Sequence, residues 1–207
     1  MHTKSKLWLF VFWACLASMI NVSGSAEASE FLADVIMKGG MESDDGKIWV
    51  KGQKSRQEIG SAAEKMIIIM DLDQGFHWTL MPDVKMYMKT RIQAKGKGFS
   101  PENFVGAQPG QMEAEITKVG TEMLKGYKCD KYLFTFKNKQ MGTMTQWFSE
   151  KLGYPIKTVN KIDKMDEIIT ELQNIHKTNV QDDLFIVPAG YQEMPITQMT
   201  QIPGKIE

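Results

Sequence analysis

Residues 76–89 of this chain read FHWTLMPDVKMYMK, two short alternating segments on either side of a turn. Large apolar side chains recur at every second position in both segments: Phe76, Trp78 and Leu80, then Met86 and Met88. Successive side chains of a β-strand point to opposite faces, so this period of two indicates strands. The intervening Pro-Asp pair is typical of a turn. We therefore predict two antiparallel strands that share one continuous apolar face.

Segments of the same character follow one another along most of the chain. Residues 47–51 and 53–59 meet at the Gly52-Gln53 pair, and such a Gly-Gln junction suits a hairpin. Residues 65–72 are apolar at both parities, which indicates a segment covered on both faces, either a strand or a helix. Further strands are expected at residues 31–38, 113–119, 131–137, 143–148, 156–159, 168–175 and 182–187. This succession is typical of a mainly β protein, an antiparallel barrel or sandwich with few and short helices.

Two stretches break the strand pattern. Residues 91–112 are rich in glycine, proline and polar side chains. Within them Ser100 followed by Pro101 suits the N-cap and first position of a short helix. The last residues of the chain carry prolines and no clear periodicity. We expect a single β domain over residues 29–192 and a flexible tail over 193–207.

The first 28 residues have the order of a secretory signal. A charged start with Lys4 and Lys6 precedes an uncharged apolar run from Leu7 to Ile20, and small and polar residues follow to Ala28. The apolar run has 14 residues, whereas a transmembrane helix needs about 20. We therefore expect residues 1–28 to be a signal peptide cleaved after Ala28, and the mature domain to be periplasmic.

A lipoprotein signal is the alternative that the leader leaves open, because Cys15 could be acylated. Bulky Phe12 and Trp13 precede this cysteine, where such a signal favours small or aliphatic side chains, and the apolar run continues beyond it. The cleaved-signal interpretation is therefore favoured.

The charge and the cysteine content of the mature chain exclude some classes of function and structure. Removing residues 1–28 takes away two lysines and one glutamate, so the net charge changes from 0 to about −1. Nucleic-acid binding requires a strongly basic surface, so we expect no nucleic-acid partner. Cys129 is then the one remaining cysteine, which excludes an intramolecular disulfide and predicts a small buried side chain.

Catalytic and metal-binding patterns are not found. The mature sequence has two histidines, His77 and His176, and contains no HExxH, CxxC, GxSxG or phosphate-loop motif. Methionine pairs such as Met86 with Met88 could bind Cu(I) through their thioethers, but they also alternate as an inward-facing strand pair would. We expect no enzymatic activity, no catalytic residue, no metal site and no cofactor.

The large aromatic side chains admit two interpretations. They could be ordinary core, which aromatic residues dominate in most proteins. They could instead line a cavity for a lipid-like ligand, where an apolar wall with few polar groups is expected. The residues alone favour ordinary core by a small margin.

Five pieces of the sequence stand out as a set: residues 46–52 (GKIWVKG), 78–87 (WTLMPDVKMY), 126–132 (GYKCDKY), 147–157 (WFSEKLGYPIK) and 183–191 (DLFIVPAGY). Together, and in this order, they resemble a family of bacterial secreted domains of unknown function that is similar to the periplasmic lipoprotein carrier LolA and its receptor LolB. The resemblance extends over about residues 30–192.

This resemblance implies an unclosed antiparallel β-barrel, a LolA-like half-barrel with a helical or loop plug and an apolar inner face for acyl chains. In the carriers an arginine on an early strand helps to hold the lid, and Arg56 occupies a comparable strand. The carriers also have clear lid helices, whereas residues 91–112 are a poorer helix sequence.

With the resemblance added, we expect a non-enzymatic carrier-like domain that binds a lipid or acyl chain, with outer-membrane components or lipoproteins as further partners. The alternative is a protein-interaction or sensor module on the same fold, with its inner face filled by its own side chains. The apolar ligand-binding face is expected to comprise Trp49, Ile68, Met70, Phe76, Trp78, Met86, Met88, Phe134, Phe136 and Trp147.

Overall fold

The computed structural model describes residues 29–39, 45–61, 65–92, 98–106, 113–163 and 165–194. The expected signal peptide lies outside these described residues, and so does the expected tail from residue 195 onward. Within the described ranges, none of the helices combines the length and the apolar character needed to cross a membrane.

Twelve strands form one sheet, and their order across it is β12-β6-β5-β4-β3-β2-β1-β11-β10-β9-β8-β7. Neighbouring strands are antiparallel except β12 and β6, which are parallel. The end strands β12 and β7 do not pair with each other, so the described sheet is not closed. The predicted mainly β, unclosed antiparallel half-barrel is therefore confirmed.

The elements have the following bounds: β1 (Glu30–Lys38), β2 (Asp45–Lys51), β3 (Lys54–Ile59), β4 (Met66–Asp71), β5 (Phe76–Met81), β6 (Met86–Arg91), α1 (Pro101–Gly106), β7 (Ala114–Leu124), β8 (Tyr127–Phe136), η1 (Lys139–Met141), β9 (Thr143–Ser149), β10 (Tyr154–Lys161), β11 (Ile168–Lys177), η2 (Asp182–Phe185) and β12 (Gln192–Glu193).

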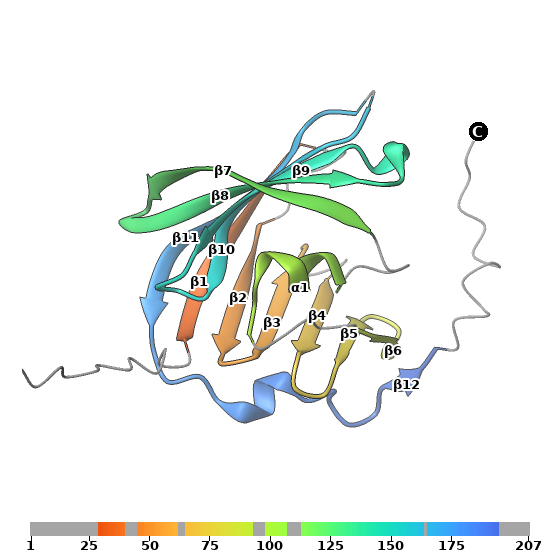
Figure 1. Cartoon of the computed structure of the whole chain (residues 1–207). Coiled ribbons are helices and arrows are strands. Elements are labelled where there is room, and N and C mark those ends of the chain that lie inside the picture. The colour runs from red at the N-terminus through yellow and green to blue at the C-terminus, as the bar shows by residue number, and fades with distance from the viewer. Residues whose placement is uncertain are drawn as a thin grey trace, which may run out of the picture.

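The sheet coils so that its two halves face each other. Figure 1 shows β7, β8 and β9 crossing above β1–β6, with α1 between the two halves. Register shifts interrupt the β1–β11, β9–β10 and β7–β8 pairings. Such bulges add local twist and bend the strand that carries them, which favours coiling of a long antiparallel sheet.

Cross-strand pairing separates the side chains of the sheet into two faces. We call inner the face that carries Phe31 and Val35 of β1, which lie opposite Val50 and Gly46 of β2. We call outer the face that carries Trp49, which lies opposite Leu32 of β1. Directly paired residues lie on the same face, so the register assigns every strand residue to one face or the other.

Several sequence predictions are confirmed locally. Gly52 and Gln53 form the two-residue connection between β2 and β3. The predicted helix start is present, because the Asn103 N–H donates to Ser100 Oγ at 3.3 Å and α1 begins at Pro101. Residues 66–71 form a strand, one of the two possibilities that their apolar character at both parities indicated; Ile67, Ile69 and Asp71 are buried on one face, and Ile68 and Met70 are partly buried on the other.

The strand predicted at residues 182–187 is wrong, because residues 182–185 form the 3-10 helix η2. Residues 184–187 are apolar without alternation, so they carry no period of two that would specify a strand. In the structure Leu184, Phe185 and Val187 all pack against one cluster on the outer face.

The end of the domain is tied to the sheet. Gln192 N–H donates to the Lys85 carbonyl at 2.9 Å, and Met194 N–H donates to the Tyr87 carbonyl at 2.7 Å. These bonds add β12 beside β6, so hydrogen-bonded structure extends two residues beyond the expected boundary at residue 192.

Candidate functional site: a cavity on the inner face

A cavity of about 370 Å³ lies on the inner face, between β1–β3 on one side and β8–β11 on the other. This size falls within the range of roughly 300–1,000 Å³ that small-molecule sites occupy. Its apolar wall comprises Val35, Met37, Ile48, Ile59, Phe136, Met141, Met144, Tyr154, Pro155, Ile156, Ile162, Ile168 and Leu172. Gln57, Gln146, Lys157, Thr158, Asn160 and Thr170 complete the lining.

Small side chains in the middle of the sheet help to leave this space open. Thr158 of β10 lies directly opposite Thr170 of β11, and Thr170 lies opposite Met37 of β1. Two threonines side by side extend less far from the sheet than the isoleucines and methionines around them. The alternation that builds the strands therefore also leaves a hollow where short side chains meet.

Tyr154, which lines the cavity, also belongs to an aromatic cluster next to it. The Tyr154 ring lies 5.8 Å from the Phe31 ring and 5.0 Å from the Phe99 ring, both edge to face. Burial raises the pKa of Tyr154, and its hydrogen bond with Ser55 opposes that shift. Since Ser55 belongs to β3 and Tyr154 to β10, this contact connects strands that are not neighbours in the sheet.

Gln146 is the unusual polar residue of the wall. It lies on the inner face of β9, opposite Thr158 and Tyr132, and is fully buried. Neither its Nε2 nor its Oε1 has a hydrogen-bond partner among the described residues. A buried polar group without a partner costs about 1–3 kcal/mol, so this carboxamide is a feature that ordinary core packing does not explain.

The wall offers little charge to a ligand. Lys157 is the only lysine or arginine in the described lining, but it pairs with Trp147 on the outer face. Its Nζ lies 5.1 Å from the Trp147 ring centroid, as expected for a cation stacked on an aromatic face. The lining therefore fits an uncharged, mainly apolar molecule.

The ten residues expected to form the apolar face do not lie together. Phe136 lines the cavity, and Phe134, two residues earlier on β8, is fully buried on the same face. Ile68, Met70, Met86 and Met88 also belong to the inner face, but on β4 and β6, outside the cavity wall.

Trp49, Phe76, Trp78 and Trp147 point to the outer face. The predicted continuous face of Phe76, Trp78, Met86 and Met88 is therefore wrong, because Trp78 lies opposite Lys89 and Met88 lies opposite Thr79. The loop between β5 and β6 has an even number of residues, so even-numbered residues of β5 pair with odd-numbered residues of β6. Shared parity across this turn consequently places side chains on opposite faces.

Two of these outer-face aromatic side chains pack in a hydrophobic cluster on that face. Trp49 and Trp78 pack against Ile67, Ile69 and Leu80, beneath residues 180–191 of the C-terminal segment. Arg56 holds this segment, because its guanidinium donates to the Leu184 carbonyl at 3.0 Å and to Glu58 at 2.8 Å. Arg56, which the sequence places on a strand comparable to that of the carriers' lid-holding arginine, thus fixes the C-terminal segment on the outer face.

Most of the cavity wall was not among the predicted site residues. The signal that could have found part of it is the alternation of residues 31–37, where Phe31, Ala33 and Val35 share one parity and are all buried. Tyr154 and Gln146 reach the same space only because β9 and β10 coil over β1. Such long-range placement is not encoded in a local pattern.

The sequence predicts that Cys129 is buried and that no metal site is present. Cys129 is fully buried, as predicted, and burial raises the pKa of its thiol. Among the residues that the structure describes, no group of three or more His, Cys, Asp and Glu side chains could hold a metal ion.

Comparison with known families and structures gives the following matches. A family model described as "Domain of unknown function (DUF4412)" matches residues 34–153 and 137–191. No curated protein matches the chain significantly.

An uncharacterised conserved protein from Thermus thermophilus shares the fold at 11% identity, with a TM-score of 0.55, 82% of this chain covered and 91% of that chain. PNGF-II also aligns at 11% identity and a TM-score of 0.55, over 84% of this chain but 32% of that one. A LolA superfamily protein from Nitrosomonas europaea aligns at 12% identity and a TM-score of 0.40, over 77% and 90%.

Proposed function

This chain belongs to the DUF4412 domain family, a family of unknown function, and we propose that it is a non-enzymatic periplasmic, lipoprotein-carrier-like domain that binds an acyl chain or similar lipid in its inner cavity. The single observation that carries the proposal is the hollow of about 370 Å³ with a predominantly apolar wall. A core that served stability alone would be filled, since protein interiors are close-packed and voids are destabilising.

The chemistry of the wall supports a lipid rather than a polar metabolite. Thirteen of its 19 lining residues are apolar or aromatic, and the lysine among them directs its ammonium to the other face. Methionine side chains at positions 37, 141 and 144 are flexible and can adjust to chains of different shape. Export to the periplasm and cleavage after Ala28 are part of this proposal and rest on the sequence of the leader.

The test is to fill the cavity. Thr170 lines the cavity, and Thr170→Phe would place an aromatic ring where a ligand must lie. N-phenylnaphthylamine, a neutral dye whose fluorescence rises in apolar sites, reports on occupancy. We expect wild-type protein to bind the dye and release it to added acyl chains, and Thr170→Phe to lose at least about 90% of the signal.

A matched control separates the cavity from the rest of the molecule. Val84 is 60% exposed and lies in the turn between β5 and β6, so Val84→Phe adds the same ring far from the cavity. This control should bind the dye as wild type does. Equal dye binding by wild type and Thr170→Phe would refute the cavity as the site.

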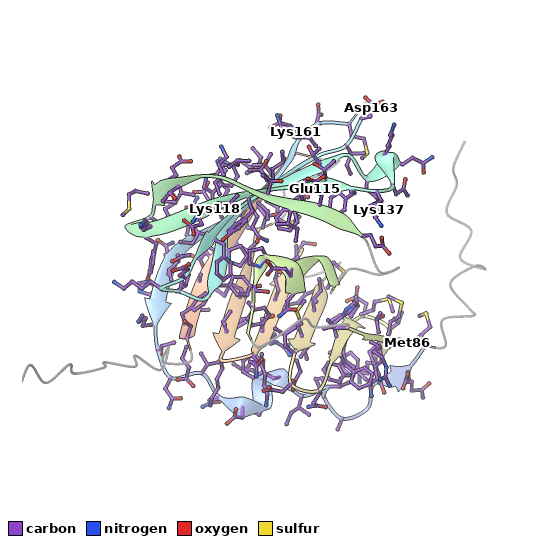
Figure 2. The ribbon with its side chains drawn as sticks, viewed as in Figure 1. Met86, Glu115, Lys118, Lys137, Lys161 and Asp163 are labelled. Carbon is purple, nitrogen blue, oxygen red and sulfur yellow. The ribbon has the colours of Figure 1, made fainter. Side chains whose placement is uncertain are left out.

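A protein-interaction module is the second candidate, and the long edge strand β7 favours it. The eleven residues of β7 are mostly exposed, including Val119 and Met123, and β7 ends the sheet. Figure 2 shows Glu115 and Lys118 along this strand, at the far end of the sheet from Met86. An exposed strand edge can accept a strand from a partner. This candidate predicts no dye binding, and cross-links in the periplasm that Val119→Lys abolishes.

A further inference from the structure

The Gln146 carboxamide is a buried hydrogen-bonding group that the fold itself leaves unused. The residue is fully buried, and both Nε2 and Oε1 lack partners among the described residues. Buried side-chain polar atoms are bonded in the large majority of cases. Gln146 belongs to the cavity wall, so the group that completes its bonding can come from a bound molecule.

We infer that Gln146 is the polar anchor of the cavity and selects a neutral acyl ligand whose head carries a donor and an acceptor side by side. This inference rests on the proposed function and specifies its ligand class. Nε2 donates and Oε1 accepts, in one plane. A primary amide or an un-ionised carboxylic acid presents the complementary pair, so both atoms of Gln146 are satisfied at once.

An ionised carboxylate fits this anchor poorly. It offers acceptors only, so it can bond Nε2 but leaves Oε1 facing a negative charge. No described lining residue supplies a free cation to compensate, because the Lys157 ammonium is stacked on Trp147. Burial of an unpaired charge is costly, so the site favours the neutral head.

Access to the anchor requires movement of a neighbouring side chain, since Gln146 is covered. Met144 lies two residues away on the same face of β9, and it also lines the cavity. A methionine has three rotatable side-chain bonds and little rotamer preference to overcome. Met144 is therefore the neighbouring side chain whose rotation we expect to open a path from the cavity to the carboxamide.

The experiment compares dodecanamide with methyl dodecanoate, which has the same chain but only acceptors, as competitors of N-phenylnaphthylamine. Wild-type protein should bind dodecanamide at least about tenfold more tightly than the ester, because both can accept from Nε2 but only the amide also donates to Oε1, which adds one buried hydrogen bond and leaves no unpartnered atom. Dodecanoate at neutral pH should bind more weakly than dodecanamide. In Gln146→Met, which keeps the side-chain length, the preference for the amide over the ester should fall to less than about threefold.

A stability measurement accompanies the binding series. Gln146→Met removes two unpartnered buried atoms, so its urea midpoint without ligand should equal or exceed that of wild type. Equal wild-type affinities for amide and ester would overturn the anchor and leave the acyl site intact. An amide preference that persists in Gln146→Met would also overturn it. Failure of every acyl compound to displace the dye, or of the dye to bind, would overturn both the anchor and the proposed function.

Discussion

The two faces of this sheet bury apolar side chains in different ways. On the outer face, Ile69 and Leu80 are fully buried because Val180 and Phe185 of the C-terminal segment cover them. On the inner face, the facing halves of the sheet leave a cavity of about 370 Å³. The fold therefore closes one apolar surface with its own chain and leaves space on the other. This difference is the basis for placing ligand binding on the inner face.

If the outer face is filled as described, truncation of Phe185 should lower the stability of the protein more than any other change considered below. This side chain is only 6% exposed and packs into the outer cluster, so Phe185→Ala should lower the free energy of unfolding by about 3–5 kcal/mol. The urea midpoint measures the loss. Ile186, which is 62% exposed, is the matched control, and Ile186→Ala should change stability by less than about 0.5 kcal/mol. A small loss for Phe185→Ala would show that the outer face is not filled as described.

Arg56 should give the next largest effect, because it ties the C-terminal segment to β3. Arg56→Met removes the charged hydrogen bonds to the Leu184 carbonyl and to Glu58 and should cost about 1.5–3 kcal/mol. Hydrogen exchange should become faster over residues 180–191 and change little around the cavity. Arg56→Lys keeps the charge without the planar fork, so it should restore only part of the loss. Uniformly faster exchange throughout the domain would argue against a local clamp.

How far the sequence predicts this molecule can be judged from particular residues. The period of two identified β5 and β6 correctly, and the Ser100-Pro101 pair identified the start of α1. The same period assigned Trp78 and Met88 to one face, whereas the register separates them. Alternation shows which residues of one strand share a face. Which residues of the next strand share that same face depends on the length of the connecting loop. The cavity could not be predicted from alternation at all, because it is formed where strands far apart in the chain coil over each other.

Truncating a side chain on the inner face should lower the free energy of unfolding by less than truncating Phe185 on the outer face. Met144 lines the cavity and is half-buried rather than packed on all sides, so Met144→Ala should cost about 1 kcal/mol, less than a fully packed methionine. Dye binding should be retained, because the hollow becomes larger. A loss comparable to that of Phe185→Ala would indicate that the inner face is packed like the outer one.

Tyr154 should contribute a still smaller effect, visible in the pH dependence of stability. Burial raises the pKa of Tyr154 in the folded protein, whereas an unfolded tyrosine titrates near pH 10. The folded state therefore holds this proton more tightly. The resulting stabilisation is complete below about pH 10 and is lost as the pH rises toward the folded pKa. Urea midpoints of wild type should fall more steeply above about pH 10 than those of Tyr154→Phe. Parallel curves for the two proteins would contradict this.

The most direct test of the central claim is native mass spectrometry of the protein purified from a periplasmic fraction, wild type beside Thr170→Phe. We expect a fraction of the wild-type protein to carry the added mass of one lipid or acyl molecule. The Thr170→Phe protein, whose cavity is filled, should appear without that mass. Wild-type protein free of bound lipid, or the same bound mass in both proteins, would contradict the account.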